Sequence, residues 1–430
     1  MLVSDQRQEH TGSYYAATVN ETTNYPAVEG ATSVDVCVVG AGFTGISTAL
    51  SLAERGYSVA VVEANRVGWG ASGRNGGQVI NGGGGIEKLR KKHGNGIAEI
   101  LHNLRWRGND IIRERIAKYD IQCDFKDGFL EVATKPSQVP YLDEYAEDRE
   151  SHPSEFEYEV WDRDKTCDLL GTDAYHGGFV CYRDGHLHPL NLCIGEARAA
   201  HNLGVNIFEQ SPVTDIRHGK RPRVETANGY VEADSVVLAG NAYSRFEPRH
   251  LSNLVFPAGT YVIATEPLGD EVAHSINKKD VAVCDLNEVV DYYRLSADNR
   301  LLYGGACNYS GRDPSSIKSF ILPRMLKVYP QLKDVKIEYE WGGKVGIVLR
   351  RIPTLGRING NVYYCQGYSG HGVCPTHVMG EVMADAVAGT MERFDLFANM
   401  NHFRIPGSQW FGNQIIALGM LFYRMKDRMP

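Results

Sequence analysis

The stretch that decides the fold is Val34-Asp35-Val36-Cys37-Val38-Val39-Gly40-Ala41-Gly42-Phe43-Thr44-Gly45, which is followed, after an apolar helical repeat, by Tyr57-Ser58-Val59-Ala60-Val61-Val62-Glu63. Its first six residues are mostly apolar β-formers, as is typical of a buried parallel strand. The three glycines fit the pattern G-x-G-x-x-G. Gly40 allows a tight turn, Gly42 lets a pyrophosphate approach the backbone, and Gly45 lets the helix pack closely on the strand. The pattern predicts a dinucleotide-binding βαβ unit.

Glu63 ends the second strand of this unit. A carboxylate at that position accepts hydrogen bonds from an adenosine ribose, and it disfavours a ribose 2′-phosphate. FAD or NAD therefore fits better than NADP. The alternative is a glycine turn in an ordinary βαβ unit. The dinucleotide site is favoured because strand, glycines, helix, second strand and terminal acid occur in the required order.

Length, composition and charge favour a soluble globular protein. The chain has 430 residues, enough for a large core and for two domains. The 45 basic and 52 acidic residues give a net charge of −7, which argues against a nucleic-acid partner. Its nine cysteines are scattered and form no C-x-x-C pair, as expected of reduced thiols in a cytoplasmic protein. No signal peptide is visible, and the apolar run 415–423 is too short to cross a bilayer.

A glycine-rich loop follows Glu63. It reads Gly70-Ala71-Ser72-Gly73-Arg74-Asn75-Gly76-Gly77-Gln78, with four more glycines at 82–85. Glycines leave backbone amides open to a ligand, and Ser72 and Arg74 are suited to phosphate contacts. A mobile linker is the alternative. It is disfavoured because Arg74, Asn75 and Gln78 stand where a linker carries Ser and Gly.

The middle of the chain alternates helical and strand patterns. The expected helices are one or two over 86–119, a charged stretch that ends near residue 170, and 190–202. The expected strands are 125–134, 177–188, 205–210 and 235–243, with a hairpin at Asn228-Gly229. His186 and His188 stand at alternate positions, which suggests two metal ligands on one strand face. We favour polar loop residues and no metal site, because no third ligand is near in sequence.

Residues 249–345 change to short aromatic strands, which favour an antiparallel sheet. Asp291-Tyr292-Tyr293-Arg294 offers groups that suit an amine pocket, with an ordinary surface strand as the alternative. The chain then repeats strand, glycine loop and helix. The loop is Gly367-Tyr368-Ser369-Gly370-His371-Gly372, and amides at the start of the following helix, 376–388, suit an anion or an electron-rich ring edge.

These motifs together resemble the D-amino-acid oxidase/glycine oxidase (DAO) superfamily of FAD-dependent oxidoreductases. Within it the chain resembles the γ-glutamylputrescine oxidase family over nearly its whole length. The narrower resemblance rests on Ser-Tyr-Tyr-Ala-Ala at 13–17, on Gly-His-Leu-His-Pro-Leu-Asn-Leu at 185–192, and on Asp291 to Gly305.

The resemblance implies an α/β fold, with a Rossmann-type FAD-binding domain assembled from discontinuous segments and an α+β substrate domain with a mostly antiparallel sheet. The expected divisions are an N-terminal arm at 1–31, the FAD-binding domain at 32–120, 186–248 and 346–395, the substrate domain at 121–185 and 249–345, and a C-terminal extension at 396–430. The expected FAD contacts are Gly40, Ala41, Gly42, Phe43, Thr44, Gly45, Glu63, Ala64, Ala71, Ser72, Arg74, Asn75, Gly76, Gly77, Gln78, Val213, Gly240, Gly367, Tyr368, Ser369, Gly370, His371 and Gly372.

The resemblance also implies oxidation of a primary amine by O₂ to an aldehyde, ammonia and hydrogen peroxide, in polyamine catabolism. Tyr292 and Tyr293 are expected to form a desolvating wall that favours the neutral amine. His371 is expected to tune the charge of the flavin. Arg294 is a candidate ligand for a substrate carboxylate, with Arg350 and Arg351 as competitors. In related sarcosine oxidases a cysteine before the last glycine loop binds the flavin covalently. Residues 344–351 contain none, so non-covalent FAD is expected.

Two other functions stay open on the sequence. One is an FAD-dependent oxidase or dehydrogenase of another amine or amino acid. The other is a non-catalytic dinucleotide-binding sensor. The sequence leaves the oligomeric state undetermined.

Overall fold

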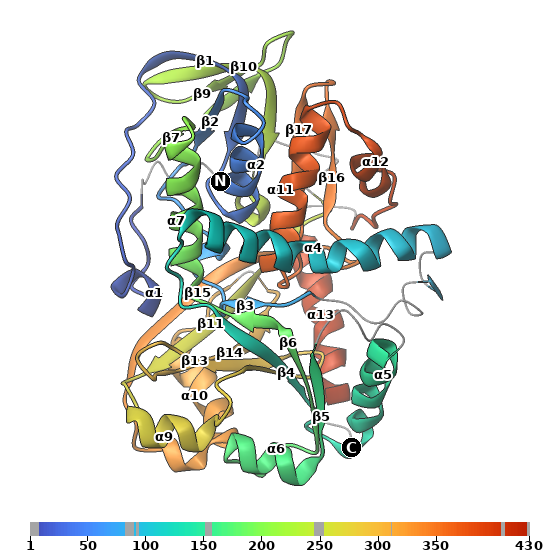
Figure 1. The fold of residues 1–430 in the computed structure, drawn as a ribbon. Coiled ribbons are helices and arrows are strands. Elements are labelled where there is room, and N and C mark those ends of the chain that lie inside the picture. Colours follow the sequence, from blue (N-terminus) through green and yellow to red (C-terminus); the bar gives the residue numbers. More distant parts are fainter. Residues whose placement is uncertain are drawn as a thin grey trace.

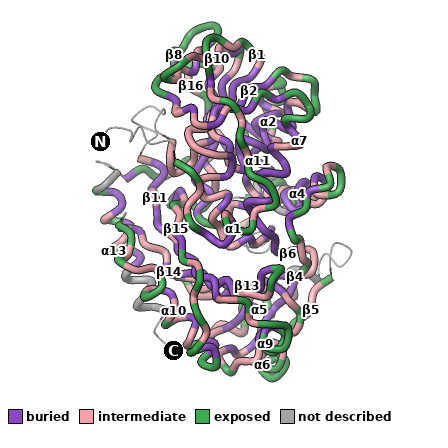
Figure 2. Tube along the Cα trace, turned by 90° about the vertical axis from the view of Figure 1, so that its left-hand side faces the viewer, coloured by how far each residue is buried: buried purple, intermediate pink, exposed green. Residues whose placement is uncertain are grey.

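The structure is a computed structural model that describes residues 8–81, 90–91, 94–150, 157–244, 253–310, 312–405 and 409–427. Two β-sheets form the centres of two halves, and the long helix α4 (Asn95–Tyr119) crosses between them (Figure 1). Buried residues fill the middle of both halves, and exposed residues gather on the outer loops (Figure 2). The predicted α/β architecture with a second sheet is confirmed.

The first sheet has eight strands, and its main path runs β16-β17-β10-β1-β2-β7. Neighbours from β17 to β7 are parallel, whereas the edge strand β16 is antiparallel to β17. An antiparallel hairpin of β8 and β9 extends β10. The bounds are β1 Gly30–Val39, β2 Val59–Val62, β7 Asn206–Phe208, β8 Asp215–Arg217, β9 Arg223–Glu225, β10 Gly229–Leu238, β16 Thr354–Ile358 and β17 Val362–Gln366.

The register of these parallel strands brings their carboxyl ends to one edge. Val39 at the end of β1 pairs with Val62 of β2 and with Leu238 of β10. Leu238 in turn pairs with Tyr364 of β17. The segments after these four strands therefore start side by side, at the edge where open α/β sheets bind their ligands.

Three helices pack against the first sheet in Figure 1: α2 (Phe43–Ala53), α7 (Pro189–Asn202) and α11 (Val373–Val387). Small residues let α2 and α11 approach closely, since a Cβ on Gly380 would lie 2.4 Å from the Ser47 hydroxyl. The short helices η1 (Ala71–Gly73), η3 (Asn241–Tyr243) and α12 (Glu392–Ala398) complete this half.

The second sheet has nine strands in the order β15-β11-β14-β13-β12-β4-β6-β3, with β5 paired to β6. It is antiparallel except for the parallel pair β4 and β12, so the predicted, mostly antiparallel sheet is confirmed. The bounds are β3 Gln78–Val79, β4 Lys126–Val132, β5 Tyr158–Trp161, β6 Gly178–His186, β11 Phe256–Thr265, β12 Ala282–Asp285, β13 Asp291–Leu295, β14 Leu301–Asn308 and β15 Ile337–Ile347.

Aromatic side chains build much of the core beneath the second sheet. Tyr293 and Tyr303 stack with ring centroids 5.5 Å apart, and the Tyr329 hydroxyl donates to the Tyr293 hydroxyl at 3.0 Å. The helices of this half are η2 Pro136–Gln138, α5 Val139–Glu150, α6 Arg163–Leu170, α9 Gly269–Ile276, α10 Ile317–Val328, η4 Pro330–Leu332 and α13 Gln409–Asp427.

The N-terminal residues lie across both halves. Glu9 receives two hydrogen bonds from the Arg66 guanidinium, at 2.8 and 2.9 Å. The single-turn helix α1 (Tyr14–Ala17) then places Tyr15, which is fully buried, against Trp341 of the second sheet at 5.3 Å between ring centroids.

One helix prediction is wrong. The charged stretch that ends near residue 170 was expected to be helical throughout, but β5 interrupts it, and α5 and α6 lie on either side. Residues 158–161 pair with β6, and this pairing places Trp161 in the core at 1% exposure. In the predicted helical region 86–119, Arg90 and Lys91 are helical and α4 begins at Asn95, after Gly94; residues 86–89 and 92–93, like glycines 82–85, lie outside the described residues. In the described parts of the chain, no helix is long and apolar enough to span a membrane.

Candidate flavin and amine site

The G-x-G-x-x-G turn has the geometry that its glycines predict. Gly40 has a φ of +105°, which side chains rarely adopt. A Cβ on Gly45 would lie 1.9 Å from the Gly40 carbonyl oxygen, so only glycine fits there. Gly42 precedes α2 without a side-chain cap, and the Ser72 hydroxyl accepts from the Phe43 amide at 2.9 Å. The backbone N–H donors and the positive end of the helix dipole at the start of α2 are therefore suited to a pyrophosphate.

Glu63 stands at the same edge. Its carboxylate accepts from the amides of Ala41 at 2.7 Å and Asn65 at 2.9 Å. Burial raises the pKa of the Glu63 carboxyl, and hydrogen bonds from the amides of Ala41, Asn65 and Ala64 oppose that rise. The side chain keeps partial exposure, as a ribose ligand needs. The predicted contacts Val213 and Gly240 lie close by in the fold: Val213 packs in the core beside Val62, and Gly240 adjoins Gly40.

The glycine loop after Glu63 is held by its own polar side chains. The Asn75 amide donates to the carbonyls of Ala71 at 3.0 Å and Ser72 at 2.8 Å, and it accepts from the Gly77 amide at 2.8 Å. Gly77 has a φ of +73°. Asn75 therefore shapes the loop.

Arg74 joins this loop to the second sheet. Its guanidinium lies 4.3 Å from the Trp69 ring centroid and donates to the carbonyls of Trp69 at 2.7 Å and Gly342 at 3.3 Å. The Trp341 indole donates in return to the Arg74 carbonyl at 2.9 Å. Desolvation lowers the pKa of the Arg74 guanidinium, although the group stays cationic.

Tyr292 and Gln78 lie where the loop meets the second sheet. The Tyr292 ring fills the space above two glycines, since a Cβ would lie 2.5 Å from the ring on Gly76 and 2.4 Å from it on Gly304. Desolvation raises the pKa of the Tyr292 hydroxyl, which therefore stays neutral. The Gln78 amide donates to the Val283 carbonyl at 3.1 Å. Tyr292 of the predicted aromatic wall thus borders the glycine loop. Tyr293, the other residue predicted for the wall, instead points into the core of the second half, where it stacks on Tyr303.

Arg294 does not have the position of a substrate ligand. It is 3% exposed, and its guanidinium donates to the carbonyls of Gly76 at 2.8 Å, Leu187 at 2.8 Å and Leu295 at 3.0 Å. It also donates to the Tyr15 hydroxyl at 3.2 Å. These contacts make Arg294 a clamp on the glycine loop. We therefore do not retain it as a substrate-carboxylate ligand, because it is buried and four of its five N–H donors already have protein acceptors.

The last glycine loop closes against the first. The Thr44 hydroxyl donates to the Tyr368 hydroxyl at 2.7 Å, and Tyr368 also lies 3.1 Å from the Cys365 sulfur. The Asn241 side chain accepts from the Gly367 amide at 2.9 Å. Gly367 and Gly370 have φ of +86° and +89°, and Gly372 precedes α11. Tyr368 therefore joins the loop to the start of α2.

His371 is exposed on this loop, and its amide donates to the Tyr368 carbonyl at 3.2 Å. Desolvation by the surrounding protein lowers the pKa of the His371 imidazole below its ordinary value of 6.5, and the Arg351 charge lowers it further to a smaller extent. The ring is therefore neutral at pH 7. Ser369, two positions earlier, has a φ of +56° and bonds through its amide to the Gly346 carbonyl at 2.8 Å.

A buried charged network beneath α2 escaped the sequence analysis. Glu196 of α7 is fully buried and contacts Arg115 at 2.9 Å and His377 at 3.1 Å. Arg115 also donates to the Ser47 hydroxyl at 2.9 Å. Although burial opposes it, the interactions with His377 and Arg115 lower the pKa of the Glu196 carboxyl. The network ties four helices together, and three ionisable residues on otherwise apolar helical faces were the available signal.

His186 and His188 have separate structural contacts. His186 Nε2 donates to the Asp280 carbonyl at 2.8 Å, and His188 Nδ1 accepts from the Asn191 amide at 3.1 Å. Burial lowers the pKa of each imidazole to about 3. Both rings are neutral, and His188 caps the start of α7.

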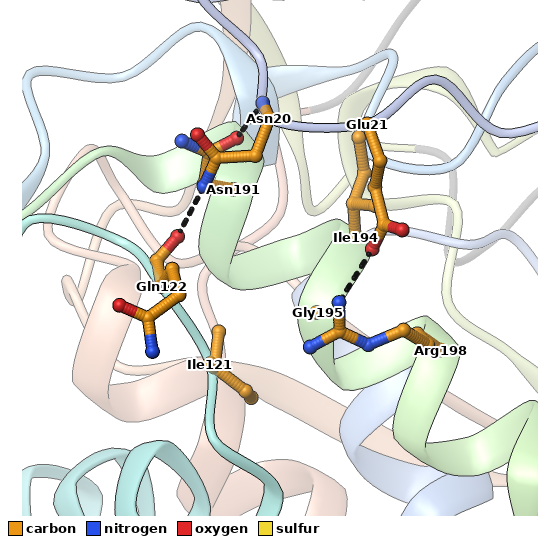
Figure 3. A pocket seen from close by; sticks show the side chains of 8 residues that line it. All are labelled: Asn20, Glu21, Ile121, Gln122, Asn191, Ile194, Gly195 and Arg198. Atoms are coloured by element: carbon orange, nitrogen blue, oxygen red, sulfur yellow. Dashed lines mark hydrogen bonds and ion pairs between the residues drawn. The ribbon is translucent and has the colours of Figure 1, made fainter.

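A cavity of about 300 Å³ opens beside the N-terminal arm, away from the glycine loops (Figure 3). Its polar groups already pair: Asn20 donates to the Asn191 side chain at 3.0 Å, and Arg198 bonds to Glu21 at 3.1 Å. We do not assign it to the reaction. It is lined by Asn20, Glu21, Ile121, Gln122, Asn191, Ile194, Gly195 and Arg198.

Two glycine loops and the Glu63 carboxylate therefore meet at one edge of the first sheet, and the Tyr292 ring of the second sheet borders them. The start of α2, where Gly42 provides no side-chain cap, suits the pyrophosphate of a flavin dinucleotide. Of the residues predicted from sequence, those of the fingerprint, both loops, Glu63, Val213, Gly240 and Tyr292 lie in or beside this region.

The sequence is similar to proteins of known class. The gamma-glutamylputrescine oxidoreductase of Escherichia coli K12 is 44% identical over 98% of this chain and 99% of its own. The probable oxidoreductase OrdL of Haemophilus influenzae is 42% identical over 98% of each. The crystal structure of glycine oxidase from Geobacillus kaustophilus shares the fold, with a TM-score of 0.71 at 19% identity, covering 86% of this chain and 100% of its own. The family model "FAD dependent oxidoreductase" (DAO) matches residues 35–386, and this chain belongs to that family of FAD-dependent oxidoreductases.

Proposed function

We propose that this protein oxidises γ-glutamylputrescine, or a closely related γ-glutamylated polyamine, at its free primary amine. The reaction consumes O₂ and water and gives the aldehyde, ammonia and hydrogen peroxide. The observation that carries the proposal is the 44% identity over nearly the full length of both chains to a gamma-glutamylputrescine oxidoreductase. An aromatic wall beside a flavin-type glycine loop supports it.

The FAD site is proposed to consist of the fingerprint glycines, Glu63, the 71–78 loop and the 367–372 loop. FAD, when bound, would accept the electron pair and hydrogen from the amine-bearing carbon. We propose that it is held non-covalently, because Cys365 and Cys374 are 1% exposed and buried in the core. Acid precipitation should therefore release all of the flavin. Colour left in the washed precipitate would contradict this.

The chain's own task is to bind the amine in its neutral form. An alkyl amine has a pKa of ~10, so it reaches the enzyme mostly as a cation. Desolvation next to the Tyr292 ring favours the neutral form, because an ammonium loses more hydration than an amine. A neutral His371 adds no charge that would repel the amine. We propose that Tyr292 forms the wall beside the reacting carbon and that His371 borders the flavin ring.

We also propose that the domains divide as the sequence predicts, with the flavin domain built on the first sheet and the substrate domain on the second, except that β3, within the segment 32–120, pairs with β6 in the second sheet. The nine cysteines are all free. Reduced thiols support the proposal of a cytoplasmic enzyme.

Peroxide release on a panel of amines tests the function. Rapid release with γ-glutamylputrescine, and slow release with putrescine, glycine and sarcosine, is the expected result. Oxidation of another amine in preference would replace the proposed substrate. Flavin reduction without peroxide would indicate a dehydrogenase that passes electrons to a carrier.

A further inference from the structure

The N-terminal stretch Ser13-Tyr14-Tyr15-Ala16-Ala17 has no task in the site as described so far. It forms the single-turn helix α1, which Ser13 caps by accepting from the Ala16 amide at 3.1 Å. A helix of four residues is unstable by itself in water, so contacts with the rest of the protein hold it in place. Tyr14 and Tyr15 make those contacts, at 3% and 0% exposure.

Tyr15 contacts the first of two side chains that hold the 71–78 loop, which is Arg294. The Arg294 Nη2 donates to the Tyr15 hydroxyl at 3.2 Å and to the Leu187 carbonyl at 2.8 Å. The Nε of the same guanidinium donates to the Gly76 carbonyl at 2.8 Å. Because a guanidinium is planar and rigid, an acceptor for one nitrogen orients the other two. The Tyr15 hydroxyl therefore helps to fix the donor that holds Gly76.

The second side chain is Trp341. The Tyr15 ring meets the Trp341 indole edge-on, with ring centroids 5.3 Å apart and an interplanar angle of 69°. The indole N–H donates to the Arg74 carbonyl at 2.9 Å. Arg74 and Gly76 are close neighbours in the loop. One buried tyrosine of the arm therefore supports both side chains that hold these two carbonyls.

The arm also holds the segment that leads into the loop. The Glu9 carboxylate pairs with the Arg66 guanidinium at 2.8 Å, and the Glu9 carbonyl accepts from the Trp69 indole at 3.0 Å. The Trp69 ring in turn lies 4.3 Å, at its centroid, from the Arg74 guanidinium. The arm thus supports the loop from both ends, through Glu9 before it and through Tyr15 beside its second half.

The second half of the loop has little room to shift. A Cβ on Gly77 would lie 2.1 Å from the Leu187 carbonyl oxygen and 2.9 Å from Arg294 Nη2. On the other side, a Cβ on Gly76 would lie 2.5 Å from the Tyr292 ring. Displacing the Arg294 guanidinium therefore moves the loop relative to the ring that the proposed function places beside the amine.

We propose that the N-terminal arm is part of the flavin site, and that Tyr15 is a positioning residue that sets the 71–78 loop through Arg294 and Trp341. The inference rests on the proposed assignment of this loop to FAD. Tyr15 acts through these two side chains and not by contact with the cofactor. Because bound FAD and the docked arm favour the same loop conformation, each stabilises the other.

Tyr14 provides a matched control on the same helical turn. Its hydroxyl donates to the Asp298 carboxylate at 2.7 Å, and its ring centroid lies 6.0 Å from that of Tyr339. Within the described part of the chain, neither of these partners bonds to the 71–78 loop. Tyr14→Phe and Tyr15→Phe each remove one hydroxyl bond of the arm and keep the ring, but only the second change reaches the loop.

The experiment compares Tyr15→Phe, Trp341→Phe and Tyr14→Phe with the unmodified holoenzyme. The rate at which FAD leaves diluted protein is followed as the rise in flavin fluorescence, and melting temperatures check that each variant folds. Tyr15→Phe removes an acceptor from a charged donor, so it should speed FAD loss about 5- to 10-fold. Trp341→Phe keeps a ring against Tyr15 but removes the donor to Arg74, and it should act in the same direction. Tyr14→Phe should leave the rate of FAD loss unchanged.

Hydrogen exchange of the holoenzyme measures the loop directly. The Gly77 amide donates to the Asn75 side chain at 2.8 Å, so its exchange reports on the loop conformation. Peptides that cover residues 71–78 should exchange faster in Tyr15→Phe, and at the unmodified rate in Tyr14→Phe. Unchanged FAD loss in Tyr15→Phe, or equal changes in the two tyrosine variants, would overturn the role of Tyr15. Neither measurement uses an amine, so a preference for another amine would refute the proposed substrate and leave this result standing.

Discussion

The Thr44 hydroxyl donates to the Tyr368 hydroxyl across 2.7 Å, between residues 324 positions apart in the chain. Thr44 lies in the first turn of α2, where a pyrophosphate would bind, and Tyr368 lies in the last glycine loop. Cys365 stands 3.1 Å from the same Tyr368 oxygen. This contact fixes the separation of the two loops that together form the proposed flavin site.

The contact is testable by a double-mutant cycle. Tyr368→Phe and Thr44→Val should each lower the free energy of unfolding by about 1 kcal/mol, the usual net value of a neutral hydrogen bond. The double variant should lose little more than either single one, because both remove the same bond. Denaturant unfolding of the holoenzyme measures all three. Fully additive losses would show that the two hydroxyls contribute independently.

Glu63 is predicted to be required for FAD binding. Glu63→Arg replaces the carboxylate that holds the Ala41 and Asn65 amides with a cation, so flavin occupancy of the purified protein should fall severalfold. Glu29→Arg, at an exposed position just before β1, makes the same charge change as a control. Equal flavin occupancy in both variants would remove Glu63 from the site.

The pH dependence should follow the substrate. Because the fraction of neutral amine rises about tenfold per pH unit below its pKa of ~10, kcat/KM should rise from neutral to alkaline pH. His371 should add no inflection there, since its pKa lies below the ordinary 6.5 and the ring is already neutral. A fluorinated amine of lower pKa should move the inflection down with it.

His371→Ala should leave that inflection in place while it slows flavin reduction or reoxidation, as measured by stopped-flow absorbance. Wild-type rates in both half-reactions would make His371 a structural residue. A kcat/KM that is flat from mildly acidic to alkaline pH would contradict selection of the neutral amine.

Breaking the buried Arg115–Glu196 pair should lower the free energy of unfolding more than breaking an exposed ion pair on the same helix. Arg115→Met leaves the Glu196 carboxylate buried without its main donor, and loss of one partner from a buried pair costs about 3–5 kcal/mol. Lys118→Met on the same helix removes an exposed pair with Glu54 and should cost under about 1 kcal/mol. Comparable shifts in the melting temperature of the two variants would refute this difference.

Local sequence pattern was sufficient to predict that the two glycine loops and Glu63 follow neighbouring strands of one sheet. Gly40, Glu63 and Gly367 each follow a short apolar strand, and the convergence of parallel strand ends at one edge follows from topology alone. Whether Arg294 binds a substrate or holds the protein backbone was not predictable in the same way. The sequence pattern around a strand arginine is the same whether its side chain faces a ligand or three backbone carbonyls. Only the positions of Gly76 and Leu187 in the folded protein distinguish the two roles.

The same limit applies to β5 and to the Glu196 network. Tyr158–Trp161 becomes a strand because β6 offers a pairing edge, which four residues of sequence do not reveal. In the sequence, Glu196 looks like a surface residue. Its partners Arg115 and His377 lie on α4 and α11, and only the folded structure places them beside it. These features depend on partners that lie far away in the chain.

Anaerobic bleaching of the bound flavin tests the central claim most directly, because it measures amine oxidation without regard to the final electron acceptor. At equal concentration, γ-glutamylputrescine should reduce the flavin at least tenfold faster than free putrescine, about 1.4 kcal/mol of discrimination by the γ-glutamyl group. Equal rates for the two amines, or a flavin that γ-glutamylputrescine leaves oxidised, would contradict the proposed function.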